Sequence, residues 1–202
     1  MHPSALCSGI WRDTFGSPEE VTPVRLFGVG NKVPIADNTA SLPFRYGDIV
    51  SRKTRRGFVV ELPMKNDEDF YGFGLQFYSF NHAGRRRFMK VNGEPVADTG
   101  ESHAPVPSYV SAAGYGLLVD TFRYVAFYLG TNGVKGSSKD CSEPVKEHNE
   151  FSERALYALK RAKTERRVLI EIPNCRGADI YFFEGPSLPE AVCRYNLFSG
   201  GG

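Results

Sequence analysis

Apolar and polar residues alternate along several short runs of this chain. The first three runs span residues 24–30, 56–63 and 73–80, and each ends at or near Gly, Pro or Asn. Alternation with a period of two is typical of a strand with one buried face, while Gly, Pro and Asn favour the turns between strands. These runs therefore predict strands of an antiparallel meander.

The second half of the chain repeats this pattern at shorter intervals. Strand-like runs span residues 105–111, 114–120 and 123–130, with turns of a few residues between them. We expect consecutive hairpins here, because short connections favour pairing between neighbouring strands. Two further runs flank residues 174–177, whose Asn and Gly suit a tight reversal. This last pair predicts the clearest hairpin of the chain.

Two other segments have helical periodicity. Residues 149–163 place their apolar side chains on one stripe opposite charged neighbours, as in an amphipathic helix. The stripe consists of Phe151, Ala155, Leu156, Leu159 and Ala162. A shorter helix is predicted to begin after Ser187, because Ser187 and Glu190 have the spacing of a capping box, and to end before Gly200.

Composition favours a fold rich in strands. The chain has 202 residues, including 21 Gly, 13 Pro and 13% aromatic residues, which suits many short strands joined by turns. Its 41% hydrophobic content is enough to fill the core of one large domain. We therefore predict a single all-β domain over residues 1–202, a large antiparallel β-sandwich of about a dozen strands with one or two short helices.

Charge and cysteine spacing exclude several classes of partner. The 25 Lys and Arg residues are balanced by 23 Asp and Glu, and a net charge of +2 does not indicate binding to nucleic acid. Two basic runs, at residues 52–56 and 85–87, lie beside predicted turns and are interpreted as solvated hairpin ends or edge strands. The four cysteines form no C-x-x-C pair, so no metal site, disulfide framework or cofactor is indicated.

The N-terminal segment shows no sign of membrane targeting. Arg12 and Asp13 follow a brief apolar stretch that is too short for a signal peptide, and no apolar run of about 18 residues follows. We expect a soluble, cytoplasmic protein without a membrane partner. Trp11 lies outside any clear strand, and we expect it either to cap the core or to lie on the surface.

Four motifs follow one another from Tyr71 onwards. They are YGFG at residues 71–74, the loop VNGEPVADTGESHAPVP, the strand pair YVSAAGYGLLVDT, and the closing segment IYFFEGPSLPEAVCRYNLFSG. Their order resembles the N-terminal domain of family 31 glycoside hydrolases, over roughly the last two thirds of the chain. The closing segment is the most specific, because a strand, Gly-Pro, a capped helix and Arg-Tyr-Asn look like the family's junction into its catalytic barrel.

The resemblance implies a galactose mutarotase-like β-sandwich that precedes a (β/α)8 barrel, in a parent enzyme of the α-glucosidase or α-xylosidase type. Residues 198–202 would begin the linker to that barrel. The family's two catalytic aspartates lie in the barrel, so no catalytic residue is expected here, and nothing in this chain marks the carboxyl pair that hydrolysis needs. The implied partners are an α-glycoside and the barrel. An exposed docking face would also favour self-association.

The resemblance further implies that a loop at residues 92–103 reaches over the barrel mouth and contacts the sugar. Carboxylate and amide oxygens accept hydrogen bonds from sugar hydroxyls, and Asn, Ser, Thr and His also donate them. The candidate substrate-binding residues are Asn92, Glu94, Asp98, Thr99, Ser102 and His103. The family often has Asn-x-Asp at the start of this loop, whereas this chain has the longer Glu94.

Three other interpretations are open from the sequence alone. Residues 98–103 could form an ordinary polar turn whose side chains bond to the local backbone. The chain could also be a stand-alone carbohydrate-binding protein that uses this loop and its aromatic residues. In the third interpretation, His82 and His103 resemble the paired histidines of aldose mutarotases, which act as general acid and base. His82 lies in a predicted turn, however, and is more simply interpreted as solvated.

Overall fold

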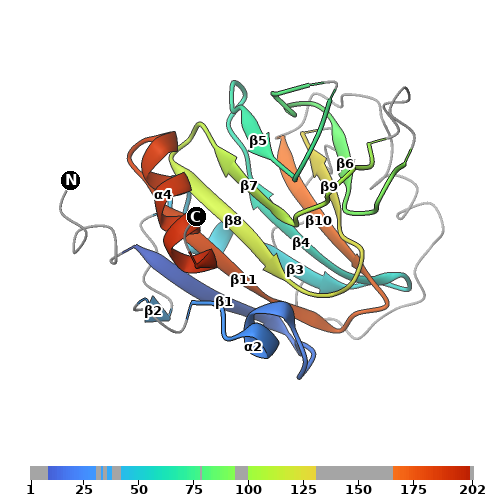
Figure 1. Cartoon of the computed structure of the whole chain (residues 1–202). Coiled ribbons are helices and arrows are strands. Elements are labelled where there is room, and N and C mark those ends of the chain that lie inside the picture. Colours follow the sequence, from blue (N-terminus) through green and yellow to red (C-terminus); the bar gives the residue numbers. More distant parts are fainter. Residues whose placement is uncertain are drawn as a thin grey trace.

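Two β-sheets pack face to face in the computed structural model, which describes residues 9–30, 33, 36–37, 42–77, 79–93, 100–130 and 166–200 (Figure 1). Sheet A contains β1 (Ile10–Gly16), β2 (Ala36–Asp37), β5 (Phe70–Gly72), β7 (Ser108–Ser111), β8 (Tyr115–Asp120) and β11 (Gly177–Glu184). Sheet B contains β3 (Val50–Lys53), β4 (Gly57–Pro63), β6 (Arg86–Phe88), β9 (Ala126–Leu129) and β10 (Arg167–Pro173).

The strand order is β2-β1-β11-β8-β7-β5 in sheet A and β3-β4-β10-β9-β6 in sheet B. Neighbouring strands are antiparallel except β1 and β2, which are parallel. A short 3-10 helix, η1 (Tyr46–Asp48), precedes β3. The predicted antiparallel all-β sandwich is confirmed. No helix in the described part of the chain is long and apolar enough to cross a membrane.

The core lies between the two sheets, because every second side chain of each strand points inward. In β4, Phe58, Val60 and Leu62 face the core, while Val59 and Glu61 point to the opposite side. Sheet A contributes Trp11, Phe15, Tyr115, Leu117, Val119, Ile180 and Phe182 to the same cluster. Trp11 therefore belongs to a regular strand and is part of the core.

Two helices cover the outer face of sheet A, namely α2 (Pro23–Phe27) and α4 (Leu188–Ser199). Val24 of α2 and Phe198 of α4 pack with Tyr181 and Phe183, which point outward from β11. The predicted helix after Ser187 is thus confirmed as α4. The segment at 149–163, for which a helix was also predicted, lies outside the described residues.

The prediction of a strand at residues 24–30 is wrong, because this segment contains α2. Thr22 caps the helix by accepting a hydrogen bond from the Arg25 amide, Pro23 begins it, and Gly28 ends it in a left-handed conformation. This is the usual sequence of helix start and stop signals. At residues 24–30 the capping residues indicate the helix correctly, whereas the pattern of apolar residues indicates a strand.

The hairpin predicted around residues 174–177 is also wrong. β10 and β11 are strands of different sheets, so the turn between them crosses from sheet B to sheet A. β11 pairs instead with β1 along seven positions, from Ile10 opposite Phe183 to Gly16 opposite Gly177. The same correction applies to β8 and β9, which lie in different sheets, whereas β7 and β8 form the expected hairpin.

Both basic runs contribute to edge strands of sheet B, which was one of the two interpretations of these runs; the other was solvated hairpin ends. Arg52 and Lys53 lie in β3, and Arg86 and Arg87 lie in β6. The second run is not uniformly solvated, however. The Arg87 side chain is only 1% exposed, and its contacts belong to the site described below.

Candidate functional site

The YGFG motif forms a sharp turn at the end of β5. Three consecutive residues have positive φ angles, at +126° for Gly72, +66° for Phe73 and +85° for Gly74. A Cβ on Gly74 would lie 1.8 Å from the carbonyl oxygen of Ala104, so only glycine allows this approach. The turn ends β5 and directs residues 73–77 out of the sheet, so the described part of residues 73–80 does not form the predicted strand.

The turn brings the following segment against the end of the candidate sugar loop. Leu75 forms an isolated antiparallel bridge with Ala104. The Ser102 hydroxyl donates to the Leu75 carbonyl over 2.9 Å, and the His103 amide donates to the same oxygen over 3.2 Å. Ser102 in turn accepts a backbone hydrogen bond from Asn92 over 2.9 Å. These contacts hold the segment after the YGFG turn against residues 102–104, so the two segments form one continuous surface.

A pocket of about 410 Å³ opens on this surface. Its lining residues are Gly72, Gly74, Leu75, Gln76, Phe77, Ser79, Phe80 and His82. The rings of Phe77 and His103 are 4.6 Å apart between centroids, with an interplanar angle of 62°, which places His103 beside the pocket. Phe77 is 64% exposed and Phe80 is 83% exposed. We call this region the YGFG pocket.

The outcomes for the six candidate binding residues differ. His103 lies beside the pocket, while Ser102 is buried and uses its hydroxyl to hold Leu75. Asn92 pairs with Ser102 through its backbone. Glu94, Asp98 and Thr99 lie outside the described residues. The structure thus brings His103 to the site and gives Ser102 a positioning contact, and it leaves the side-chain role of Asn92 as a prediction.

His82 forms part of the pocket wall and is not a solvated turn residue, contrary to the simpler interpretation. Its side chain is 1% exposed and packs edge-on against Phe73, with ring centroids 5.2 Å apart. Arg87 donates from Nε to His82 Nδ1 over 2.9 Å. The sequence does not indicate this pair, because an arginine in an edge strand with charged neighbours has the signature of a solvated residue.

Exposed aromatic rings give the pocket its chemical character. Phe80 lies next to Tyr71, with ring centroids 4.9 Å apart, and Phe77 lies next to His103. Exposed aromatic faces favour ligands with apolar surfaces, and polar groups around them fix a ligand's orientation. The arrangement suits reversible binding of a ring that has both apolar faces and hydroxyl groups.

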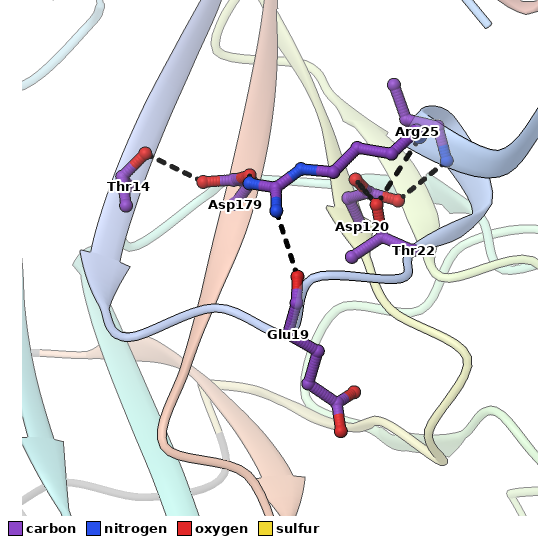
Figure 2. Close-up of polar contacts among 7 residues, drawn as sticks. Thr14, Glu19, Thr22, Arg25, Asp120 and Asp179 are labelled. Atoms are coloured by element: carbon purple, nitrogen blue, oxygen red, sulfur yellow. Dashed lines mark hydrogen bonds and ion pairs between the residues drawn. The ribbon is translucent and has the colours of Figure 1, made fainter. Parts of the chain in front are cut away.

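A second polar cluster lies on the outer face of sheet A, where α2 crosses it (Figure 2). Asp120 of β8 and Asp179 of β11 occupy directly opposed positions in the strand pair. Asp120 accepts hydrogen bonds from the Thr22 hydroxyl over 2.6 Å and from the Val24 amide over 3.0 Å. The second carboxylate, Asp179, contacts Arg25 over 2.6 Å.

This carboxylate pair clamps α2 to the sheet. Thr14 donates to Asp179 over 2.7 Å, so both carboxylates are engaged by groups of the protein. Burial raises the pKa of Asp120, while the hydrogen bonds from Thr22 and Val24 act in the opposite direction. Both side chains are almost fully buried, so the cluster supports the helix and offers no open acid and base to a substrate. Among the described residues, no group of three or more His, Cys, Asp or Glu side chains is arranged to hold a metal ion.

Solved structures give the fold a context. The chain superimposes on a Flavobacterium johnsoniae GH31 dextranase complexed with glucose, with a TM-score of 0.52 and 17% identity over 78% of the chain. The chain has the fold of a β-sandwich within a family 31 glycoside hydrolase. It spans about 15% of the dextranase's length.

Two further enzymes superimpose on the chain less closely. A Listeria monocytogenes cycloalternan-forming enzyme in complex with a pentasaccharide substrate has a TM-score of 0.47 and 21% identity, over 72% of this chain and 12% of its own. A GH31 α-xylosidase from a soil metagenome, complexed with xylose, has a TM-score of 0.45 and 14% identity. The match covers 76% of this chain and 17% of the xylosidase. No protein-family model matches the chain, and no curated protein is detectably similar to it in sequence.

Proposed function

We propose that this chain is the non-catalytic N-terminal domain of a family 31 glycoside hydrolase of the α-glycosidase type. In this proposal the domain packs on a catalytic (β/α)8 barrel, and the loop at residues 92–103 contributes to the sugar-binding site. The galactose mutarotase-like character of the sandwich belongs to the same proposal. The observation that carries it is the contact between His103 of that loop and Phe77 of the exposed YGFG pocket.

The geometry of the pocket supports a role at a sugar site. Pyranose rings have apolar faces formed by C–H groups and an edge of hydroxyls, so they bind where exposed aromatic rings lie beside polar groups. Phe77 offers the ring, and the imidazole of His103 next to it can donate or accept a hydrogen bond. Gln76 adds an amide at the pocket lining.

The chemistry of the described carboxylates supports a role without catalysis. Hydrolysis of a glycosidic bond needs two carboxyl groups about 5 to 10 Å apart on either side of the sugar. Asp120 and Asp179, the opposed pair, are buried under α2 and bonded to Thr22, Arg25 and Thr14. In this proposal the reacting carboxylates come from the barrel, and this domain positions the sugar.

Titration calorimetry combined with a hydrolysis assay tests the proposal on the purified chain. We expect weak, millimolar binding of α-linked glucose or xylose oligosaccharides, because only part of the site is present, and no release of reducing sugar. His103→Ala is expected to weaken binding without unfolding the domain. Hydrolysis by the chain alone would contradict the proposal, as would faster anomer interconversion that depends on His103, which would favour a mutarotase.

A further inference from the structure

A second exposed apolar surface lies around α2, away from the YGFG pocket. It consists of Val21, Leu26, Phe27, Phe122 and Tyr124, whose exposed fractions lie between 55% and 70%. We call it the α2 surface. The rings of Phe27 and Phe122 are 6.4 Å apart in an edge-to-face arrangement, which joins the helix to the turn after β8. In Figure 1, α2 and β5 lie at opposite ends of the sandwich.

The α2 surface is held rigidly although it is solvent-exposed. A helix of five residues is too short to be stable alone. Asp120 fixes its first turn by accepting from Thr22 and Val24, and Arg25 reaches over β11 to Asp179 (Figure 2). Leu26 and Phe27 are thereby fixed in an exposed position, and a preorganised surface loses little conformational entropy on binding.

The size of the α2 surface matches one half of a standard protein interface. Side chains of this type that are more than half exposed leave roughly 100 Å² each, which gives on the order of 500 Å² of apolar area. This is about the size of the largest apolar patch on a soluble monomer, and such patches are often functional. A homodimer interface that is about 65% apolar and buries about 800 Å² per partner needs a similar apolar area.

The charges at the edge of this surface favour a second copy of the chain as the partner. Glu19 and Arg123 form an ion pair of 2.5 Å beside the apolar side chains, so the rim carries both signs. In a two-fold symmetric dimer each surface meets its own copy in the reverse direction, and a rim with both signs can pair with itself. A surface with charges of a single sign would repel its copy.

We propose that the α2 surface binds the α2 surface of a second copy to form a two-fold symmetric dimer. Phe27 lies at the centre of the contact, and Glu19 and Arg123 lie at its rim. This interaction is independent of the proposed sugar site, because it uses the other end of the sandwich. The dimer would then present two YGFG pockets, one on each copy, that face away from the dimer contact.

Sedimentation equilibrium of the purified chain at micromolar concentrations tests the dimer. We expect a mass of twice 22.5 kDa for the wild-type chain and a mass close to 22.5 kDa for Phe27→Asp. The substitution is expected to weaken self-association by about 30-fold or more, as for a central interface residue. Phe80→Asp is the matched control, because Phe80 is also largely exposed, at 83% against 70% for Phe27, but lies at the YGFG pocket. This variant is expected to stay dimeric.

Reversing the rim charges gives an independent measurement. Glu19→Arg is expected to weaken the dimer, and combining it with Arg123→Glu is expected to restore it, because the rim again carries both signs. Circular dichroism establishes that each variant is folded. A monomeric wild-type chain would overturn the proposal, as would a dimer that survives Phe27→Asp or one that Phe80→Asp dissociates. None of these outcomes bears on sugar binding by the pocket.

Discussion

Arg87 donates from Nε to Nδ1 of His82 over 2.9 Å, and both side chains are 1% exposed. Because Nδ1 is the acceptor, the imidazole is neutral and carries its proton on Nε2. The hydrogen bond thus fixes both the orientation and the tautomer of His82, which lines the YGFG pocket. A buried cation from edge strand β6 supports the wall of the candidate site.

Removal of the Arg87 guanidinium is expected to destabilise the domain. Arg87→Met deletes a buried, charge-assisted hydrogen bond, which contributes about 1.5 to 3 kcal/mol to the free energy of unfolding. The neighbouring Arg86 is exposed and lies over the Phe88 ring at 5.8 Å, so Arg86→Met is expected to cost less than about 1 kcal/mol. Urea denaturation of the two variants measures the difference, and equal losses would contradict a supporting role for Arg87.

The YGFG turn requires glycine at its last position for two separable reasons. Gly74→Ala introduces both an unfavourable positive φ and a Cβ that would lie 1.8 Å from the Ala104 carbonyl oxygen. Gly84 also has a positive φ, of +72°, but a Cβ there would meet nothing within 4 Å. We expect Gly84→Ala to cost about 1 to 2 kcal/mol from backbone strain alone. Gly74→Ala is expected to cost more and to separate Leu75 from His103.

Thermal denaturation gives the stability of both glycine variants. Amide hydrogen exchange at His103, which donates to Leu75, reports whether the loop has separated from the pocket. If Gly74→Ala and Gly84→Ala have the same stability and the same exchange at His103, the close approach of the two segments does not require glycine.

The clamp on α2 predicts a dependence of stability on pH. Burial raises the pKa of Asp120 above its unfolded value, so the native state holds this proton more tightly than the unfolded chain. This contribution to stability is fully present below about pH 4 and is lost as the pH rises through the native pKa. We expect the free energy of unfolding of wild type, relative to that of Asp120→Asn, to fall as the pH rises from about 4 through the native pKa of Asp120. A difference that rises with pH would contradict the assignment.

Much of the fold could be predicted from the pattern of residues. The runs that became β4, β7, β8 and β9 were located correctly, because each is a short, largely apolar run with Gly or Pro at or near an end. Most residues of these strands are buried. The capping-box spacing of Ser187 and Glu190 located α4, although the Ser187 hydroxyl donates to the Glu190 carboxylate over 2.9 Å and does not accept from a helix amide. Alternation specifies which side chains point inward but not which strand lies alongside. The partner of β11 is β1, whose paired residues lie 161 to 173 positions earlier, and not the adjacent β10.

The candidate site could be predicted only in part from the pattern of residues. The loop residue His103 does lie beside a pocket, but the pocket depends on Gly72 and Gly74, whose backbone angles end β5 early. Nothing local to residues 73–80 distinguishes an exposed loop with aromatic residues from a strand. The burial of Arg87 depends on its contact with His82, and a sequence gives no measure of such a contact.

The position of bound sugar on the domain tests the proposed function most directly. We would titrate the isotopically labelled chain with methyl α-glucoside and methyl α-xyloside and follow backbone resonances by two-dimensional NMR. Shifts confined to the YGFG pocket and to His103 are expected, with loss of binding in Phe77→Ala and retention in Phe122→Ala, a variant of the α2 surface. Saturating sugar that shifts no resonance, or that shifts resonances elsewhere on the sandwich, would contradict a sugar site at this pocket.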